Sequence, residues 1–233
     1  MRSTNKKIGI IGGVGPQATS FIYNKIIDLS QTKYGAKNNN DFPQVIIESV
    51  PIPDFISNKK QMNIAKEMLI DTTKSLTNAG ATVLCIGSNT VHLLLEDLKK
   101  ETTVKFVSML NLVAQECSSR KLKAVGLLGT SVLLKSEMYQ RELTDKGIAT
   151  ILPTQEQFSS IDQLIRDVIA GKQNGENKQK YIAILNELYE KGAESIILGC
   201  TELPLALNYE ALGDRTINSD EILAKGLVDY YYS

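Results

Sequence analysis

Residues 80–90, GATVLCIGSNT, align without a gap with residues 192–202, GAESIILGCTE, which lie 112 positions further along the chain. Each copy has a Gly-Ala pair, a short apolar run, a Gly, a small residue with a hydroxyl or a thiol, and two polar residues. A glycine after a helical pattern predicts the end of a helix, and the apolar run predicts a buried strand. We therefore expect one helix and strand unit to occur twice, with Ser88 and Cys200 at equivalent strand ends.

The rest of the chain repeats in the same way. Residues 124–130, AVGLLGT, echo residues 8–13, IGIIGG, and apolar residues recur at helical spacing over 18–29, 61–79 and 181–189. Strands that alternate with helices predict parallel sheets. The expected fold class is therefore α/β, with two pseudo-symmetric α/β domains, each a mainly parallel sheet flanked by helices.

The period of the repeat sets the expected domain boundaries. We expect an N-terminal domain over residues 1–115 and a C-terminal domain over 116–219, and we expect a last helix, about 220–233, to pack back onto the first domain. Ligands of parallel sheets bind beyond the carboxyl ends of the strands. The loops at 12–19, 49–55, 87–92, 129–131 and 199–204 leave those ends, which predicts an active site in an interdomain cleft.

Composition excludes several classes of protein. Lys and Arg together number 26, as do Asp and Glu, so there is no excess positive charge to hold a nucleic acid. No apolar run approaches the roughly 20 residues of a membrane span, and the start of the chain does not fit a signal peptide. Three scattered cysteines indicate neither a disulfide framework nor a metal cluster, which favours a cytoplasmic protein.

Three loop motifs carry a resemblance to a known family. GGVGPQAT at 12–19, SNTVH at 88–92 and LGCTELP at 198–204 resemble the aspartate/glutamate racemase superfamily, in the same order and spacing over essentially the whole chain. The resemblance implies a two-domain fold, no pyridoxal phosphate or other cofactor, a homodimer, and a cysteine from each domain flanking the α-carbon of a small amino or carboxylic acid.

The chain departs from this pattern at the first cysteine, where Ser88 stands; the second is Cys200. The resemblance leaves three readings of Ser88, because some superfamily racemases carry a hydroxyl residue there, arylmalonate decarboxylases use a single cysteine, and a serine can also replace a native cysteine. The related aspartate racemases often have an Arg after the Ile-Pro-Asp motif and a Lys near 157–160. Here Phe55 and an uncharged QFSS stand at those places, which weakens the case for a dicarboxylic substrate.

Cys200 is the predicted acid/base. A thiol with an ordinary pKa of about 8.5 becomes a usable base when neighbouring donors stabilise its thiolate, although a free cysteine is also often an ordinary buried residue. Ser88 needs an adjacent base to exchange protons. His92, the single histidine, is the possible auxiliary group, with a helix cap or surface role as the alternative.

The predicted substrate-binding groups share a place at strand ends. Most of them are short donors suited to an α-carboxylate, whereas Glu202 fits a substrate ammonium or an auxiliary proton. Each taken singly also fits a helix cap. The set is Gly13, Asn89, Thr90, Thr130, Thr201 and Glu202.

A dinucleotide site is a rival for the first loop, because residues 13–18 also fit G-x-G-x-x-A and Glu48 ends the next strand. The interval to Glu48 is longer than the usual one of about 20 residues, and that scheme leaves the second copy unexplained. The chain is therefore predicted to be an isomerase, a cofactor-independent racemase of aspartate or glutamate that exchanges the α-proton through a thiol. A one-cysteine lyase or decarboxylase, or an inactive protein that binds small acids, stays open.

Overall fold

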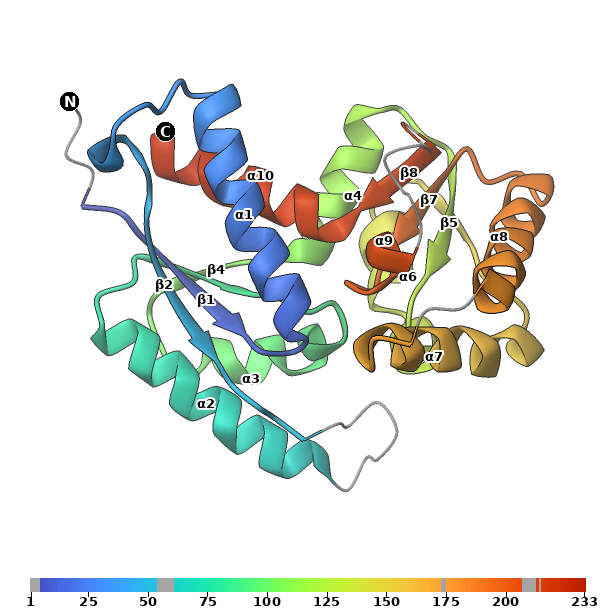
Figure 1. Cartoon of the computed structure of the whole chain (residues 1–233), viewed down its shortest axis with the longest axis horizontal. Helices are drawn as coiled ribbons and strands as arrows, with labels where there is room; N and C mark the ends of the chain where they lie inside the picture. The colour runs from blue at the N-terminus through green and yellow to red at the C-terminus, as the bar shows by residue number, and fades with distance from the viewer. Residues whose placement is uncertain (1–4, 54–60, 173–174, 207–212, 214) are drawn as a thin grey trace. The chain divides into compact units, whose positions relative to one another are not determined.

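The computed structural model describes residues 5–53, 61–172, 175–206, 213 and 215–233. It divides the chain into two compact units (Figure 1). Unit 1 comprises residues 1–109 and 220–233, and unit 2 comprises 110–219. Short helices of the 3-10 type are labelled η.

Unit 1 contains β1 (Lys7–Gly12), α1 (Pro16–Thr32), η1 (Asn39–Asp41), β2 (Gln44–Ser49), α2 (Met62–Asn78), β3 (Val83–Ile86), η3 (Thr90–Leu94), α3 (Leu95–Lys99), β4 (Lys105–Val107) and α10 (Ser219–Tyr232). Unit 2 contains α4 (Met109–Ser119), β5 (Ala124–Leu128), α5 (Ser131–Ser136), α6 (Met138–Thr144), β6 (Ala149–Ile151), α7 (Gln155–Ile169), α8 (Gly175–Glu190), β7 (Ser195–Leu198), α9 (Leu203–Ala206) and β8 (Thr216–Asn218).

The two sheets have the same topology. Their strand orders are β2-β1-β3-β4 and β6-β5-β7-β8, and every pair is parallel. The predicted fold class, two α/β units with parallel sheets flanked by helices, is confirmed. β8 was not predicted, because its three residues carry too short an apolar run to be distinguished from a loop.

The opening sequence repeat corresponds to a structural one. β3 and β7 each have four fully buried residues, and each runs beside the central strand of its own sheet. The glycine before each strand has a positive φ, +86° at Gly80 and +99° at Gly192, which is why glycine ends both preceding helices. The alignment at an offset of 112 residues therefore matches one strand to its structural equivalent.

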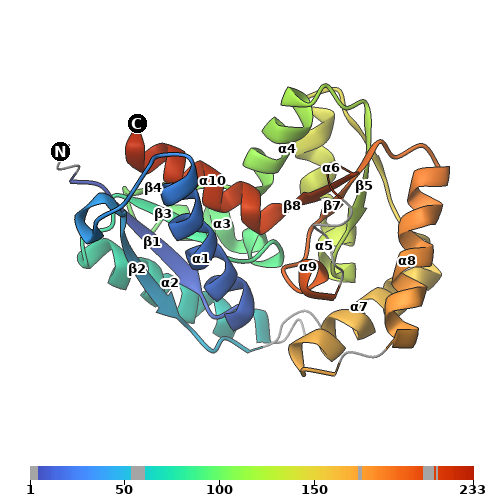
Figure 2. The same cartoon turned by 45° about the horizontal axis from the view of Figure 1, so that its top comes forward.

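Both sheets are covered on their two faces. In unit 1, α2 and α3 pack against one face through Leu69, Leu76 and Leu98, and α1 and α10 lie side by side on the other (Figures 1 and 2). An ion pair between Lys25 of α1 and Glu221 of α10 at 2.7 Å joins the two helices, and Tyr34, just after α1, stacks on Tyr232 of α10. The last helix thus packs within unit 1.

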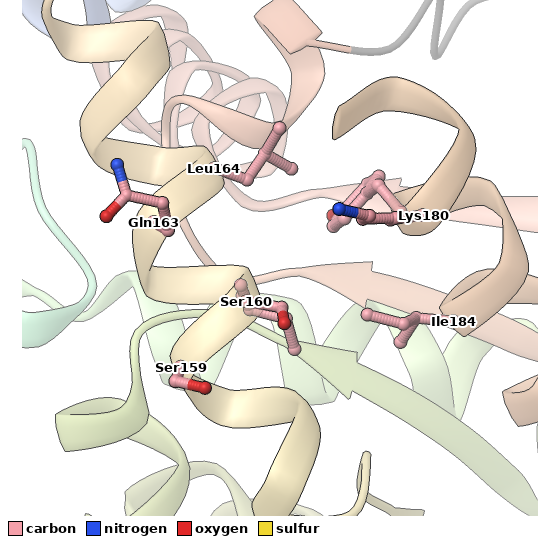
Figure 3. Close-up of a pocket in the computed structure, with 8 residues that line it drawn as sticks. Ser159, Ser160, Gln163, Leu164, Lys180 and Ile184 are labelled. Atoms are coloured by element: carbon pink, nitrogen blue, oxygen red, sulfur yellow. The ribbon is translucent and has the colours of Figure 1, made fainter. Parts of the chain in front are cut away.

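In unit 2, α7 and α8 cover one face of the sheet, and α4 and α6 lie on the other (Figure 2). Ile161 and Ile165 of α7 and Leu185 and Leu188 of α8 form an apolar cluster with the strand residues. Burying side chains of this size stabilises the unit by about 1.5–3 kcal/mol each. A small open pocket lies between the two helices (Figure 3).

Candidate active site

Ser88 and Cys200 occupy equivalent positions in their own units. Each is the second residue after its strand, because β3 ends at Ile86 and β7 ends at Leu198. The glycine between is held by the neighbouring central strand: Gly87 N–H donates to the Ile11 carbonyl at 2.9 Å, and Gly199 N–H donates to the Leu128 carbonyl at 2.7 Å. Both side chains are 7% exposed. Each sheet therefore presents one small polar side chain at its carboxyl end.

At the unit 2 end, Cys200 belongs to a hydrogen-bonded cluster. Its thiol donates to Glu202 Oε2 at 3.0 Å, and the hydroxyl of Thr201 donates to the same oxygen at 2.7 Å. Glu202 is only 4% exposed and accepts both bonds as a carboxylate. A thiol that shares its proton with a buried carboxylate has an acid/base partner within reach.

The other two thiols lie in different surroundings. Burial raises the pKa of Cys117 to about 12 and raises the pKa of Cys85 still further. Both side chains are fully buried, and Cys85 lies inside β3. Thiols that stay protonated and inaccessible are poor nucleophiles and bases, so Cys200 is the reactive candidate among the three free cysteines.

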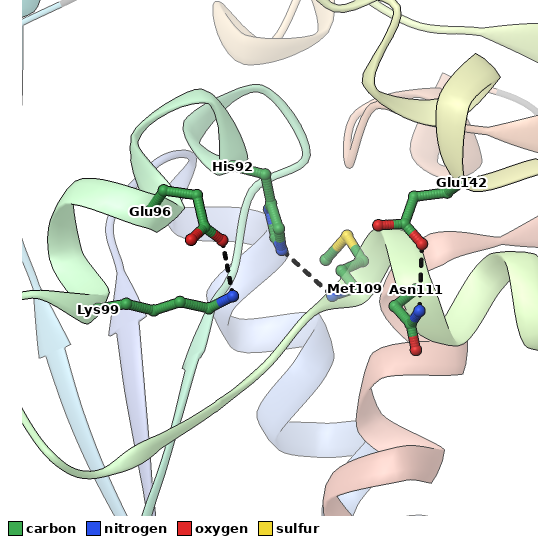
Figure 4. A network of polar contacts seen from close by, with 6 residues as sticks. All are labelled: His92, Glu96, Lys99, Met109, Asn111 and Glu142. Carbon is green, nitrogen blue, oxygen red and sulfur yellow. Dashed lines mark hydrogen bonds and ion pairs between the residues drawn. The ribbon is translucent and has the colours of Figure 1, made fainter. Parts of the chain in front are cut away.

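At the unit 1 end, the hydroxyl of Ser88 has no hydrogen-bond partner among the described residues, whereas its carbonyl oxygen accepts a bond from His92 Nδ1 at 2.8 Å. The opposite ring nitrogen, Nε2, accepts the backbone N–H of Met109 at 3.1 Å (Figure 4). Because that N–H only donates, the ring carries its proton on Nδ1. Both nitrogens of His92 are therefore bonded to backbone groups of unit 1.

His92 is neutral in the folded chain. Its pKa is lowered to about 4, chiefly by burial; the hydrogen bond to the Ser88 carbonyl opposes this shift, and the positive charge of Lys99 adds a smaller lowering effect. Lys99 itself pairs with Glu96 at 2.7 Å (Figure 4). His92 thus holds the Ser88 loop in place, and in this arrangement it has no lone pair directed at the Ser88 hydroxyl.

The first strand of each unit ends in a loop built on a threonine. Gly13 N–H donates to Thr19 Oγ1 at 2.9 Å, and a side chain at Gly13 would meet the Val50 backbone at 2.5 Å with a φ of +87°. In unit 2, Thr130 Oγ1 accepts the N–H of Leu133 at 3.1 Å and caps α5. The N–H of Gly13 and the hydroxyl of Thr130 are thus used inside their own loops.

The remaining predicted residues lie in these same strand-end loops. Asn89 and Thr90 are buried beside Ser88 at the start of η3, and the Asn89 carbonyl accepts the N–H of His92 at 3.2 Å. Within each unit the structure thus groups the predicted residues around one end, with Asn89, Thr90 and His92 near Ser88, and Thr201 and Glu202 near Cys200.

Two residues of unit 2 were not predicted from the sequence. Asp162 of α7 accepts the backbone N–H and the hydroxyl of Ser131 at 2.8 and 2.6 Å, which fixes the loop that carries Thr130. Tyr181 is 1% exposed and packs in the same apolar cluster as Cys200. Both lie in amphipathic helices, where a carboxylate looks like a solvated residue and a tyrosine like a core residue.

Over the part of the chain that the structure describes, no three side chains of His, Cys, Asp or Glu are grouped as metal ligands. None of the described helices has the length and apolar character needed to cross a membrane. Phe55, which stands where the related racemases often have an Arg, lies outside the described residues.

Comparison with known proteins identifies the class. Residues 11–225 match the Asp/Glu/Hydantoin racemase family, and the chain belongs to this family. It is 30% identical to the broad specificity amino-acid racemase RacX of Bacillus subtilis over 227 residues, which is 96% of this chain and 97% of that protein.

Two solved structures have the same fold over almost their whole length. The first, an aspartate racemase homologue from Pyrococcus horikoshii, has a TM-score of 0.81 and 33% identity, with 98% of this chain and 100% of that one covered. The second, the Picrophilus torridus aspartate racemase, has a TM-score of 0.82 and 25% identity, with 97% and 94% covered.

Proposed function

We propose that the protein is a cofactor-independent amino-acid racemase in which Cys200 exchanges the α-proton of the substrate. The observation that carries this proposal is the thiol of Cys200 at 3.0 Å from Glu202 Oε2, at a strand end of a racemase-family fold. Removal of an α-proton needs a base on one face of the carbon, and inversion needs a donor on the other. Ser88, at the equivalent strand end of unit 1, is the residue that we assign to the second face.

Glu202 is assigned as the partner that receives the thiol proton. When its carboxylate accepts that proton, the thiolate of Cys200 is free to remove the α-proton, and the reverse step restores the thiol. Thr201 holds the same carboxylate oxygen through its hydroxyl. Asn89, Thr90, Thr130 and the loop at Gly13 are the proposed substrate-binding positions.

The substrate class follows from the relatives. RacX of Bacillus subtilis is described as a broad specificity amino-acid racemase, whereas the similar solved structures include aspartate racemases. The residues at 157–160, QFSS, are uncharged. We therefore propose a range of α-amino acids that includes aspartate and glutamate. A homodimer stays a prediction, which sedimentation velocity measures.

The surroundings of Ser88 favour a second candidate function. The hydroxyl of Ser88 has no base bonded to it in the described part of the chain, since His92 is occupied by backbone groups. That asymmetry favours a catalyst that delivers a proton from the Cys200 face alone, as a lyase or decarboxylase of the family does. Exchange without inversion is its signature.

The test is incubation in heavy water with L and D forms of aspartate, glutamate and a panel of uncharged amino acids. Nuclear magnetic resonance follows loss of the α-proton, and chiral chromatography follows the other enantiomer. Exchange with inversion supports a racemase, and exchange from one enantiomer alone supports the second candidate. Absence of exchange with every substrate contradicts the racemase.

Glu202→Gln sharpens the assignment of Glu202. The amide is similar in shape but does not take the proton, so we expect exchange to fall about 10- to 100-fold. Alkylation of Cys200 by iodoacetamide should slow as well, because the thiol no longer has a carboxylate that takes up its proton. Unchanged rates of exchange and alkylation would contradict the assignment of Glu202.

A further inference from the structure

Asp162 of α7 is bonded to the loop that follows β5, 31 positions earlier in the chain. One carboxylate oxygen, Oδ1, accepts the backbone N–H of Ser131 at 2.8 Å, and the other, Oδ2, accepts the Ser131 hydroxyl at 2.6 Å. Hydrogen bonds to a carboxylate are shorter and roughly twice as strong as those between neutral groups. One carboxylate thus restrains both the backbone and the side chain of Ser131.

The loop at 129–131 lies against the strand end that carries Cys200. β5 and β7 are neighbouring parallel strands, and the Gly199 N–H donates to the Leu128 carbonyl at 2.7 Å. A side chain at Gly129 would lie only 3.0 Å from the Gly199 carbonyl oxygen. The two strand-end loops of unit 2 therefore touch at the residue that precedes Cys200.

Leu133 of α5 is fully buried and packs against both loops. A side chain at Gly129 would lie 2.7 Å from Cδ2 of Leu133, and one at Gly199 would lie 3.0 Å from the same atom. The N–H of Leu133 donates to Thr130 Oγ1 at 3.1 Å. Because Ser131 is the first residue of α5, the bonds that restrain Ser131 also restrain the helical turn that supports both loops.

We propose that Asp162 is a positioning residue that holds the loop at 129–131 in the place where it binds the carboxylate of the substrate. This inference rests on the proposed function, in which Thr130 is a substrate-binding position. Asp162 acts through Ser131, and a site is precise when such supporting bonds lock its binding groups. Loss of Asp162 should weaken substrate binding more than it slows proton exchange, because the exchange is assigned to Cys200.

Asp162→Ala is the first test, with L-aspartate as the probe in the heavy-water exchange assay. Loss of both bonds to Ser131 should raise KM about tenfold and change kcat by less than about threefold, the pattern of an interaction made equally with substrate and transition state. Asp162→Asn keeps an acceptor for the Ser131 N–H and gains a donor for the Ser131 hydroxyl oxygen. Its KM should therefore return to near the wild-type value.

Two further variants serve as control and cross-check. Asp167→Ala removes a carboxylate of the same helix, which accepts a bond from Gln163 at 2.9 Å, and should leave KM unchanged. Ser131→Ala removes the hydroxyl bond and keeps the backbone one, so KM should rise about threefold. In the Asp162→Ala background the same change should add nothing, because its partner is already absent.

An unchanged KM in Asp162→Ala overturns the inference. A fall of kcat at unchanged KM also overturns it, since a merely structural role lowers the fraction of active enzyme without changing its affinity. Asp162→Asn behaving like Asp162→Ala contradicts positioning through the bonds to Ser131. Circular dichroism verifies the fold of each variant, and Ser131→Ala, which keeps Asp162, decides the question if Asp162→Ala does not fold.

Hydrogen–deuterium exchange with mass spectrometry tests the positioning without turnover. The peptide over residues 129–136 should exchange about tenfold faster in Asp162→Ala and at the wild-type rate in Asp162→Asn, with β3 as an unchanged internal reference. Equal exchange of residues 129–136 in wild type and Asp162→Ala overturns the positioning even if the protein is a racemase. Faster exchange there, in a protein that removes no α-proton, contradicts the proposed function instead.

Discussion

The two strand ends that carry Ser88 and Cys200 have the same backbone and different chemistry. Both follow a buried four-residue strand and a glycine bonded to the central strand. At one end the thiol of Cys200 bonds to a buried carboxylate, and at the other the hydroxyl of Ser88 has no described partner while its carbonyl is held by His92. The duplicated fold thus keeps two positions equivalent, whereas of the two side chains only that of Cys200 has a described carboxylate as its hydrogen-bond partner.

Cys200→Ser tests the strand end that carries the thiol, and it should have the largest effect on the exchange of the α-proton. Loss of the thiol should lower α-proton exchange about 10³-fold, which is about 4 kcal/mol of transition-state stabilisation. The rate of exchange in heavy water measures it. Cys117→Ala, which removes a different buried thiol, should exchange at close to the wild-type rate. Retained exchange in Cys200→Ser would contradict the assignment of Cys200 as the group that exchanges the α-proton.

His92 makes the unit 1 end sensitive to acid. Its folded pKa of about 4 lies below the ordinary value of 6.5, so the unfolded chain takes up the proton first. Its contribution to stability is complete above pH 6.5 and is lost as the pH falls toward 4, by about 3 kcal/mol over the whole window.

Urea unfolding at pH 7.5, 6.5 and 5.5 measures this loss of unfolding free energy, because carboxylates titrate mostly below that range. His92→Asn, which keeps a donor near the Ser88 carbonyl, should make the free energy of unfolding depend less on pH between 6.5 and 5.5. Since the chain has one histidine, an unchanged slope in the variant would contradict the assignment.

Replacing Gly87 and Gly199 by alanine, one at a time, tests how tightly the two strand ends are packed. A side chain at Gly199 would lie 2.9 Å from the Leu128 carbonyl and 3.0 Å from Leu133, whereas one at Gly87 would lie no closer than 3.4 Å to its neighbours. Gly199→Ala should therefore cost about 2 kcal/mol of unfolding free energy. Gly87→Ala is the matched control with a smaller loss, and equal losses would argue against the difference in packing.

Ser88→Cys should have the smallest effect, as a gain. A thiol at the unit 1 end adds a group that exchanges protons without a neighbouring base, so the rate of interconversion of the two enantiomers should rise about tenfold. Chiral chromatography measures it, and Ser88→Ala separates the thiol effect from loss of the hydroxyl. An unchanged rate would place Ser88 outside the reaction.

Much of the fold could be predicted because its signals are local. The apolar runs at 83–86 and 195–198 and the glycines at 80 and 192 identified equivalent strands and helix ends, since burial and positive φ restrict those positions strongly. α7 follows the same kind of local signal, since its apolar positions recur at helical spacing after a capping box at Thr154, but the bonds between Asp162 and Ser131 join residues 31 positions apart and could not be read from a local pattern.

The sequence by itself determined which residues follow the strands, and so proposed Cys200 and Ser88 as a pair. Only the tertiary structure decided that the thiol faces Glu202, that both nitrogens of His92 are bonded to backbone, and that Tyr181 packs in the apolar cluster of Cys200. The physical reason is that strand ends follow from local pattern and backbone hydrogen bonding, whereas the partner of a buried polar group depends on residues brought together by packing.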